Sequence, residues 1–372
     1  AVDIQQSTVC TQIDGASFNS KFNGEQRGGT RIPFSFGQDS IRELQVITNA
    51  FDAQYGDASG AIVNAITKNG TNDISGGFMA LFRPNSLVAN MKPLPPMYMT
   101  SSTGVTTDYN AATNSALKRT FSQSQFAFNV GGPIIKDKLF YFVNVETVHY
   151  KQDNQPKVSF DKSGGTDQAY ATFWGQGGMG ATLITANNGA TLGQESSAPW
   201  TDDIKHTAAF ARIDWNINAA NRAVFRLNAQ TYKGLNDVYS RSYRTTTAQS
   251  NNSEADYNTL SWVAELNTII SNNLVNEARV QIATERRPNT PNSTICSEVG
   301  VPSFYAGQYN RDPSGTDEFT TQVIDNLTWM QGDWTVKGGF DLQFLSFKNT
   351  YYPYQAGGWK FNTWDIANQW WS

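Results

Sequence analysis

Apolar and polar residues alternate one by one along much of the chain after residue 73. Phe126, Phe128 and Val130 share one face of an extended segment, and Gln125 and Asn129 lie on the other. Alternation with a period of two is typical of a strand with one apolar and one polar face. The sequence therefore predicts a series of half-buried β-strands. Six further segments repeat the pattern: 139–146, 209–217, 223–230, 260–267, 277–282 and 336–344.

The apolar faces carry Trp or Tyr near the ends of the predicted strands, and the polar faces carry charges. Transmembrane β-barrels have this arrangement, because aromatic residues collect at the two membrane interfaces while polar residues face the interior. A soluble β-sandwich would also alternate, but the aromatic ends and the charged faces favour a barrel. The aromatic positions are Tyr141, Trp215, Trp262, Trp329 and Trp334.

Eight charged residues fall on the polar faces, often as opposite charges within one segment. In a barrel we expect these side chains to face the lumen. They would either line a path for substrate or form salt bridges with neighbouring strands and with a unit held inside the barrel, and we favour the second role. The eight residues are Arg212, Asp214, Arg226, Glu265, Glu277, Arg279, Lys337 and Asp341.

Turn length also alternates along the predicted strands. Short periplasmic turns opposite long external loops are the asymmetry expected of an outer-membrane barrel. None of the seven segments places a charge on its apolar face, where Lys or Arg costs about 2–4 kcal/mol at mid-depth. The short turns are 218–221 and 271–273, and the long segments are 84–122, 151–205, 232–256 and 284–320.

The first 73 residues differ from the rest in composition and in the pattern of apolar residues. Residues 11–40 are rich in Gly, Asn and Ser and predict turns and loops. Residues 41–48 predict a short strand, 49–56 one or two helical turns, and 61–66 a buried strand. We therefore expect a small α+β unit at 1–73, followed by the β-barrel part at 74–372.

Composition agrees with a β-rich chain. Of 372 residues, 13% are aromatic and only 16% are charged, against about 25% charged in average soluble domains. No run of Lys or Arg indicates a nucleic-acid partner, and no run of 18 apolar residues indicates a membrane helix. The start of the chain lacks the basic and apolar regions of a signal peptide. Cys10 and Cys296 lie far apart, and the sequence leaves their pairing open.

The stretch IRELQVITNAFDAQYGDASGAIVNAITKNGTN, residues 41–72, resembles the end of the plug domain of TonB-dependent outer-membrane receptors. The residues 24–30 and the stretch GGPIIKDKLFYF at 131–142 are similar to the Oar-like branch of these receptors. The resemblance spans residues 11–146, and beyond it only the strand rhythm agrees. The positions that match the plug signature in order are Tyr55, Gly56, Gly60, Asn64, Thr67 and Lys68.

The resemblance implies a plug inside a barrel of about 22 strands in the bacterial outer membrane. It also implies contact with outer-membrane lipid, an extracellular ligand such as a peptide, protein or glycan, and a TonB-type energy-transducing complex of the inner membrane as partner. No cofactor is implied. About nine or ten barrel strands are predicted here, so we interpret the chain as an internal fragment: the late plug and the first part of the barrel.

Two other functions remain open. One is a non-transporting outer-membrane structural or adhesion protein that keeps the plug and barrel pattern. The other is a secreted β-rich carbohydrate binder. The sequence carries no enzyme signature, and two His and two distant Cys make a zinc site improbable.

Several further residues are candidates for binding. The Gly-rich basic loop at 24–31 could cradle an anion, but we favour packing against the barrel interior, since its spacing fits no phosphate motif. Asp14 and Asp39 are expected to be lone carboxylates that cap turns. Aromatic residues in the external loops could recognise the ligand or pack among themselves: Tyr170, Trp174, Tyr352 and Trp359.

Overall fold

The computed structural model describes most of the chain. Among the described residues, no helix is both long enough and apolar enough to cross a membrane. The described residues are 9–29, 32–34, 36–48, 60–87, 98–100, 106–108, 121–154, 172–173, 176–196, 198–237, 247–301, 304–363 and 366–367.

Four short strands near the N-terminus form a small sheet in the order β2-β1-β4-β3. β1 pairs in parallel with β4, while β2 and β3 pair antiparallel with their neighbours. Ile62 and Ala65 of β4 are fully buried. The predicted strands at 41–48 and 61–66 are confirmed, and the predicted helical turns at 49–56 lie outside the described residues. The bounds are β1 (Val9–Ile13), β2 (Ala16–Ser17), β3 (Ile41–Ile47), β4 (Ala61–Thr67) and the 3-10 turn η1 (Gln38–Ser40).

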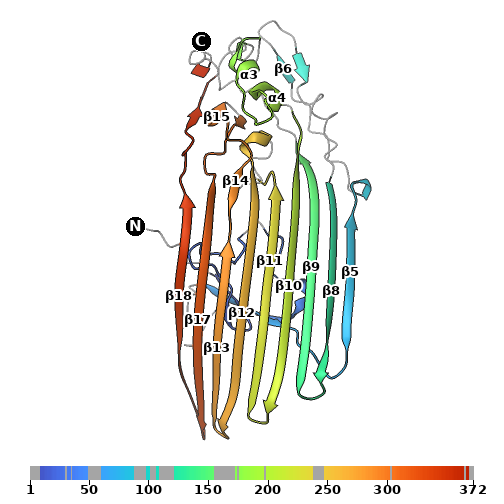
Figure 1. Cartoon of the computed structure of the whole chain (residues 1–372), viewed down its shortest axis with the longest axis vertical. Helices are drawn as coiled ribbons and strands as arrows, with labels where there is room; N and C mark the ends of the chain where they lie inside the picture. The colour runs from blue at the N-terminus through green and yellow to red at the C-terminus, as the bar shows by residue number, and fades with distance from the viewer. Residues whose placement is uncertain are drawn as a thin grey trace.

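A second, ten-stranded sheet forms the wall of the molecule. Its long strands run antiparallel in the order β5-β8-β9-β10-β11-β12-β13-β17-β18, and the short β14 bridges β12 and β17. Figure 1 shows these strands side by side, with the small sheet behind them. The bounds are β5 (Ser75–Arg83), β8 (Phe121–Ile135), β9 (Leu139–Asn154), β10 (Trp200–Asn218), β11 (Asn221–Leu235), β12 (Ser253–Ser271), β13 (Leu274–Arg286), β14 (Asn289–Pro291), β17 (Ser314–Gln331) and β18 (Trp334–Tyr351).

The two faces of the wall divide as the alternation predicts. On the outer face Phe128 is 50% exposed and Phe344 63% exposed, although both are large and apolar. On the inner face Asn144 and Glu146 are fully buried. Apolar residues outside and polar residues inside are the reverse of a soluble protein, so the outer face is suited to lipid.

Two details of the prediction are wrong. The wall strands are longer than the apolar segments, so the connections between them shorten to 155–199, 236–252 and 287–313. The added strand ends do not follow the rule of apolar residues outside and polar residues inside, because Ile204, Tyr232, Ala255 and Tyr257 form a buried apolar cluster there. Strand pairing continues through them because it needs only backbone hydrogen bonds. For the same reason Trp262 lies in the middle of β12 and not near its end.

The connections at one end of the wall fold into a cap with its own apolar core, formed around Phe173, Leu192, Val299, Phe304 and Phe361. Figure 1 shows α3, α4 and β15 above the strand ends, on the side opposite the short turns. The cap contains the sheet β16-β15-β19. The bounds are α3 (Met179–Thr182), α4 (Leu192–Glu195), η5 (Gln249–Asn251), β15 (Glu298–Val301), β16 (Phe304–Ala306) and β19 (Gly358–Lys360), and the remaining elements are η2 (Asn85–Leu87), β6 (Tyr98–Thr100) and β7 (Thr106–Asp108).

Candidate functional site

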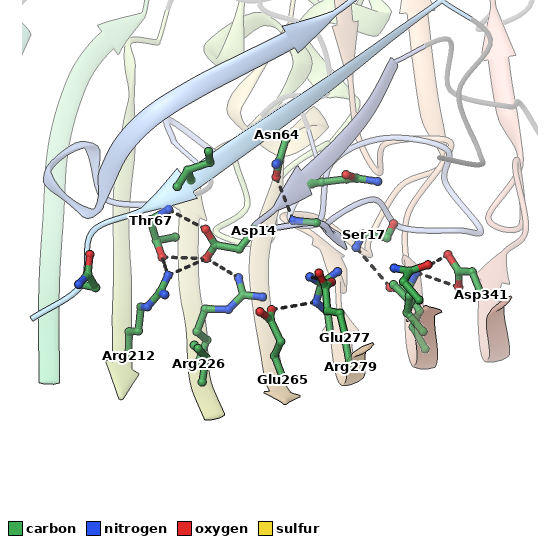
Figure 2. A pocket seen from close by; sticks show the side chains of 18 of the residues that line it. Asp14, Ser17, Asn64, Thr67, Arg212, Arg226, Glu265, Glu277, Arg279 and Asp341 are labelled. Carbon is green, nitrogen blue, oxygen red and sulfur yellow. Dashed lines mark hydrogen bonds and ion pairs between the residues drawn. The ribbon is translucent and has the colours of Figure 1, made fainter. Parts of the chain in front are cut away.

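The small sheet, the loop 18–29 and η1 form an inner unit that rests against the inner face of the wall. Between the two lies a polar cavity of about 380 Å³, here called the inner cavity. Figure 2 shows side chains of both parts converging on it. Its charged lining residues are Asp14, Arg42, Arg212, Arg222, Arg226, Glu265, Glu277, Arg279 and Asp341.

Asp14 is the centre of the contact between the inner unit and the wall. It lies in the turn between β1 and β2 with a positive φ of 44°, which presents its carboxylate to the cavity. The carboxylate accepts hydrogen bonds from the backbone N–H and the hydroxyl of Thr67, both at 2.8 Å. On the wall side it pairs with Arg226 at 2.9 Å and Arg212 at 3.3 Å. One carboxylate therefore links two strands of the inner unit to two strands of the wall.

The two wall arginines are held by further contacts. Nε and Nη2 of Arg212 donate to the two oxygens of Asp214, each at 2.8 Å, in a bidentate pair. Arg226 also donates to the backbone carbonyl of Ile13 at 2.8 Å. Because Arg226 is only 4% exposed at its side chain, its charge depends on Asp14 and on the inner unit's backbone.

A second charged group lies next to the first. Arg279 of β13 pairs with Glu265 at 3.1 Å and with Glu277 at 2.5 Å. Its guanidinium also lies against Gly15, where an added Cβ would be 2.7 Å from Nη1. The positive φ of 78° favours glycine at this position, and an added Cβ would also displace the Arg279 guanidinium.

The glycine-rich loop of the inner unit lies on two carboxylates of the wall. Glu318 of β17 accepts from the hydroxyl of Ser20 at 2.7 Å, the N–H of Phe22 at 3.1 Å and Nη1 of Arg27 at 3.1 Å. The N–H of Gly28 donates to Glu285 of β13 at 2.7 Å. The predicted packing of this loop against the interior of the wall is therefore confirmed for its described part, and Arg31 lies outside the described residues.

The 3-10 turn η1 of the inner unit also contacts the wall. The backbone N–H of Gln38 donates to Glu146 of β9 at 2.8 Å, and Asn129 of β8 donates to Asp39 at 3.2 Å. The inner unit is thus bound to β8, β9, β10, β11, β13 and β17 by polar contacts. The expectation that Asp14 and Asp39 are lone carboxylates is wrong, because the fold brings both against polar groups of strands more than 80 residues away.

The predicted plug-signature positions fall partly within the described chain. Asn64 accepts from the N–H of Gly15 at 3.0 Å, and Thr67 contacts both Asp14 and Arg212. The N–H of Lys68 donates to the carbonyl of Ser40. Gly60 is exposed at the start of β4. Tyr55 and Gly56 lie outside the described residues.

The eight predicted lumen charges lie on strands of the wall. Six of them line the inner cavity: Arg212, Arg226, Glu265, Glu277, Arg279 and Asp341. Asp214 pairs with Arg212 and with Arg222 at 2.6 Å. Lys337 follows the outward-facing Val336 on β18 and so lies on the inner face, but it does not line this cavity. Their part in a substrate path stays a prediction.

The predicted loop aromatics are placed unequally. Trp359 of β19 lines a second cavity in the cap, whereas Tyr352 is 61% exposed and does not line it. Tyr170 and Trp174 lie outside the described residues. The sequence analysis missed Glu285 and Glu318 because both fall in the segment 284–320, which the alternation pattern predicts to be a loop, whereas the structure places them on β13 and β17.

The site contains no arrangement of a nucleophile and a base, and within the described chain no three His, Cys, Asp or Glu residues are grouped to hold a metal ion. Neither Cys10 nor Cys296 forms a disulfide in the described chain. What the arrangement provides is a small unit held against the wall by direct hydrogen bonds and ion pairs.

Comparison with known proteins agrees with this architecture. A family model described as an outer membrane beta barrel domain matches residues 66–161 and 179–369. Among curated proteins, the TonB-dependent transporter Oar of Myxococcus xanthus is 27% identical over 130 residues, which cover 35% of this chain and 10% of that protein. The chain thus matches about a tenth of the length of this curated relative.

Solved structures of two receptors share the fold. The siderophore receptor PirA of Acinetobacter baumannii has a TM-score of 0.52 at 14% identity, covering 93% of this chain and 41% of that one. A variant of the ferric enterobactin receptor PfeA of Pseudomonas aeruginosa has a TM-score of 0.51 at 13% identity, covering 91% and 41%. At these identities the likeness concerns the fold alone.

Proposed function

This chain belongs to the outer membrane beta barrel domain family, and from that premise we propose that it works in a TonB-dependent receptor that imports a ligand by energy coupling to the inner membrane. Its place is the bacterial outer membrane, and its fold, a β-barrel wall with a small N-terminal sheet, is the predicted one. The relatives reported above are transporters and receptors, not enzymes.

The observation that carries the proposal is the polar contact between the inner unit and the wall. An apolar interface would lock the inner unit in place, because its separation would expose apolar surface to water. Charged and hydrogen-bonding groups can exchange their partners for water, and a cavity of about 380 Å³ already lies between them. The inner unit can therefore rearrange while the wall keeps its strand pairing.

In this proposal residues 1–73 act as the plug and residues 74–372 contribute to the transmembrane barrel. The external loops bind the ligand, and an inner-membrane complex of the TonB type pulls on the plug from the side of the short turns. Such a pull would have to break the Asp14 contacts with Arg212 and Arg226, since they join the plug's β1–β2 turn to the wall.

The native Cys10 provides a test of this movement. Cys10 is 1% exposed and lines the inner cavity. In a Cys296→Ser background, a small maleimide added to cells should label Cys10 faster when the inner membrane is energised than after treatment with a proton uncoupler. In cells that lack the TonB-type complex, the labelling rate of Cys10 should be the same with and without the uncoupler.

A barrel without transport would give a different result. A structural or adhesion protein would leave Cys10 labelling slow and equal in energised and uncoupled cells. A matched control is a cysteine at the exposed Tyr352 of the cap, which should react at the same rate in both conditions.

A further inference from the structure

The cap contains a second cavity, here called the cap pocket, of about 420 Å³. It lies where the upper ends of β11 and β12 and the segment before β17 meet the sheet β16-β15-β19. Pockets of roughly 300–1,000 Å³ hold small-molecule ligands, so the size suits a short ligand rather than a folded protein. The lining residues are Asp237, Thr247, Asn251, Asn252, Ser253, Glu298, Tyr305, Tyr309, Asn310, Arg311, Tyr354, Gly358, Trp359 and Lys360.

The apolar surface of the cap pocket comes from aromatic rings. Tyr305, Tyr309, Tyr354 and Trp359 line it, and no Val, Leu, Ile, Met or Phe does. Trp359 is 48% exposed and Tyr354 60% exposed, so both keep surface available for contact. Aromatic rings offer flat apolar faces beside polar tips. This lining suits the C–H faces of sugar rings.

The polar lining has a group that lacks a partner. Asn252 is 1% exposed, and its Nδ2 donates to the carbonyl of Ala248 at 3.0 Å. Its Oδ1 is buried and accepts no hydrogen bond from the described residues. A buried acceptor without a donor is costly, but this oxygen has less than 1 Å² of accessible surface, so a ligand in the pocket would reach it only after the side chain rotates.

The charges of the cap pocket balance. Arg311 and Lys360 stand against Asp237 and Glu298. Both carboxylates already accept hydrogen bonds: Glu298 from Nδ2 of Asn310 at 2.7 Å and Asp237 from the hydroxyl of Tyr232 at 2.8 Å. A pocket with two charges of each sign does not select a charged ligand, and its amides and carboxylates suit hydroxyl groups, which both donate and accept.

We propose that the cap pocket binds a short, uncharged oligosaccharide, with Trp359 as its main stacking surface. This rests on the proposed function in one respect, namely that the cap faces the cell exterior. Binding itself requires no transport, so the two proposals can fail separately.

The test uses the protein purified in detergent and two arrays, one of neutral oligosaccharides and one of peptides of similar size. At least one saccharide should be retained, and its Kd is then measured by calorimetry. Trp359→Ala should weaken binding at least about tenfold, as expected for a buried aromatic contact. Tyr352→Ala is the matched control, because Tyr352 is an exposed aromatic residue of the same region outside the pocket, and it should leave the Kd unchanged.

Two further measurements keep the result interpretable. Trp359→Tyr should restore most of the affinity if loss in Trp359→Ala reflects stacking rather than a collapsed cap. The Kd should change little between about 0.05 and 0.5 M salt, where an ionic ligand would lose affinity through screening.

Three results would overturn the proposal: no saccharide is retained, peptides are retained in place of saccharides, or Tyr352→Ala weakens binding as much as Trp359→Ala. Energy-dependent labelling of Cys10 is independent of all three. Binding without that labelling would reject transport and keep the cap pocket, and labelling without binding would do the opposite.

Discussion

Replacing Asp14 by Asn should release the inner unit from the wall without unfolding the wall. The carboxylate accepts from Thr67 twice and pairs with Arg212 and Arg226. After the change Arg212 keeps its bidentate partner Asp214. Arg226, which is almost fully buried, keeps the Ile13 carbonyl and loses its paired carboxylate.

The size of the effect follows from that buried arginine. Removing one partner of a buried ion pair costs about 3–5 kcal/mol, because the other charge is left uncompensated. The adjoining inner cavity admits water to the site, so we expect a value near 3 kcal/mol, at the lower end. This corresponds to a rise of roughly a hundredfold in the equilibrium between the released and the bound inner unit.

The assay is maleimide labelling of Cys10 in the purified Cys296→Ser protein. Cys10 is fully buried, so it reacts only from the released state. Where release and return are faster than labelling, the labelling rate follows the population of that state. All ten Trp residues lie after residue 73, so unfolding followed by Trp fluorescence reports on the chain after the inner unit and should be unchanged.

Asp39→Asn is the matched control. Asp39 is also a carboxylate of the inner unit, but it accepts one hydrogen bond from a neutral amide of the wall. Asparagine keeps an oxygen that can accept this bond, so only its charge-assisted part is lost, about 1 kcal/mol or roughly fivefold in rate. Equal labelling rates in the Asp14 and Asp39 variants would refute the assignment of Asp14 as the main link.

Three further changes test other parts of the structure. Gly15→Ala should raise the maleimide labelling rate of Cys10 roughly tenfold, because the left-handed backbone costs about 1–2 kcal/mol without glycine and the new Cβ would crowd Arg279. A labelling rate equal to that of the protein with Gly15 would contradict the contact. Phe344→Arg, on the lipid-facing side of β18, should destabilise the folded protein in the membrane by about 2–4 kcal/mol and so lower its yield. The adjacent inner-face Gln343→Arg should leave the yield unchanged, and equal yields of the two variants would contradict the assigned faces. Burial, followed by a nearby carboxylate, raises the pKa of Cys296 above its usual value. Because the thiolate is the reactive form, the maleimide labelling rate of Cys296 should be slower at neutral pH than that of an exposed cysteine, and it should keep rising with pH beyond the usual thiol pKa. A pH profile equal to that of a small free thiol would contradict this.

The sequence predicted the wall well because lipid imposes a strict rule on each strand. Every second residue must tolerate hydrocarbon, so Phe128, Trp215 and Phe344 could be assigned outward from their spacing alone. The same rule does not act above the membrane. This is why the alternation pattern predicts loops at the upper ends of β10 and β12 and a strand end near Trp262.

The contacts inside the barrel could not be predicted in the same way. Asp14 lies 198 residues from Arg212 and Glu318 lies 291 residues from Arg27. Periodicity assigns each charge to a face but not to a partner, because pairing depends on where the inner unit sits relative to the wall. The motif residues Asn64 and Thr67 were recognised from a resemblance, and only the structure relates them to Gly15 and Asp14.

The length of the wall strands has a consequence for how the cell meets its surroundings. β10 and β12 each contain 19 residues, or about 60 Å of strand at 3.3 Å per residue. The apolar band of an outer-membrane barrel is only about 25 Å tall, and strands tilted by about 40° use roughly 33 Å to cross it. The remaining length of paired strand extends beyond the apolar band and holds the folded cap away from the lipid headgroups. A molecule too bulky to reach the bilayer surface could therefore still contact the cap.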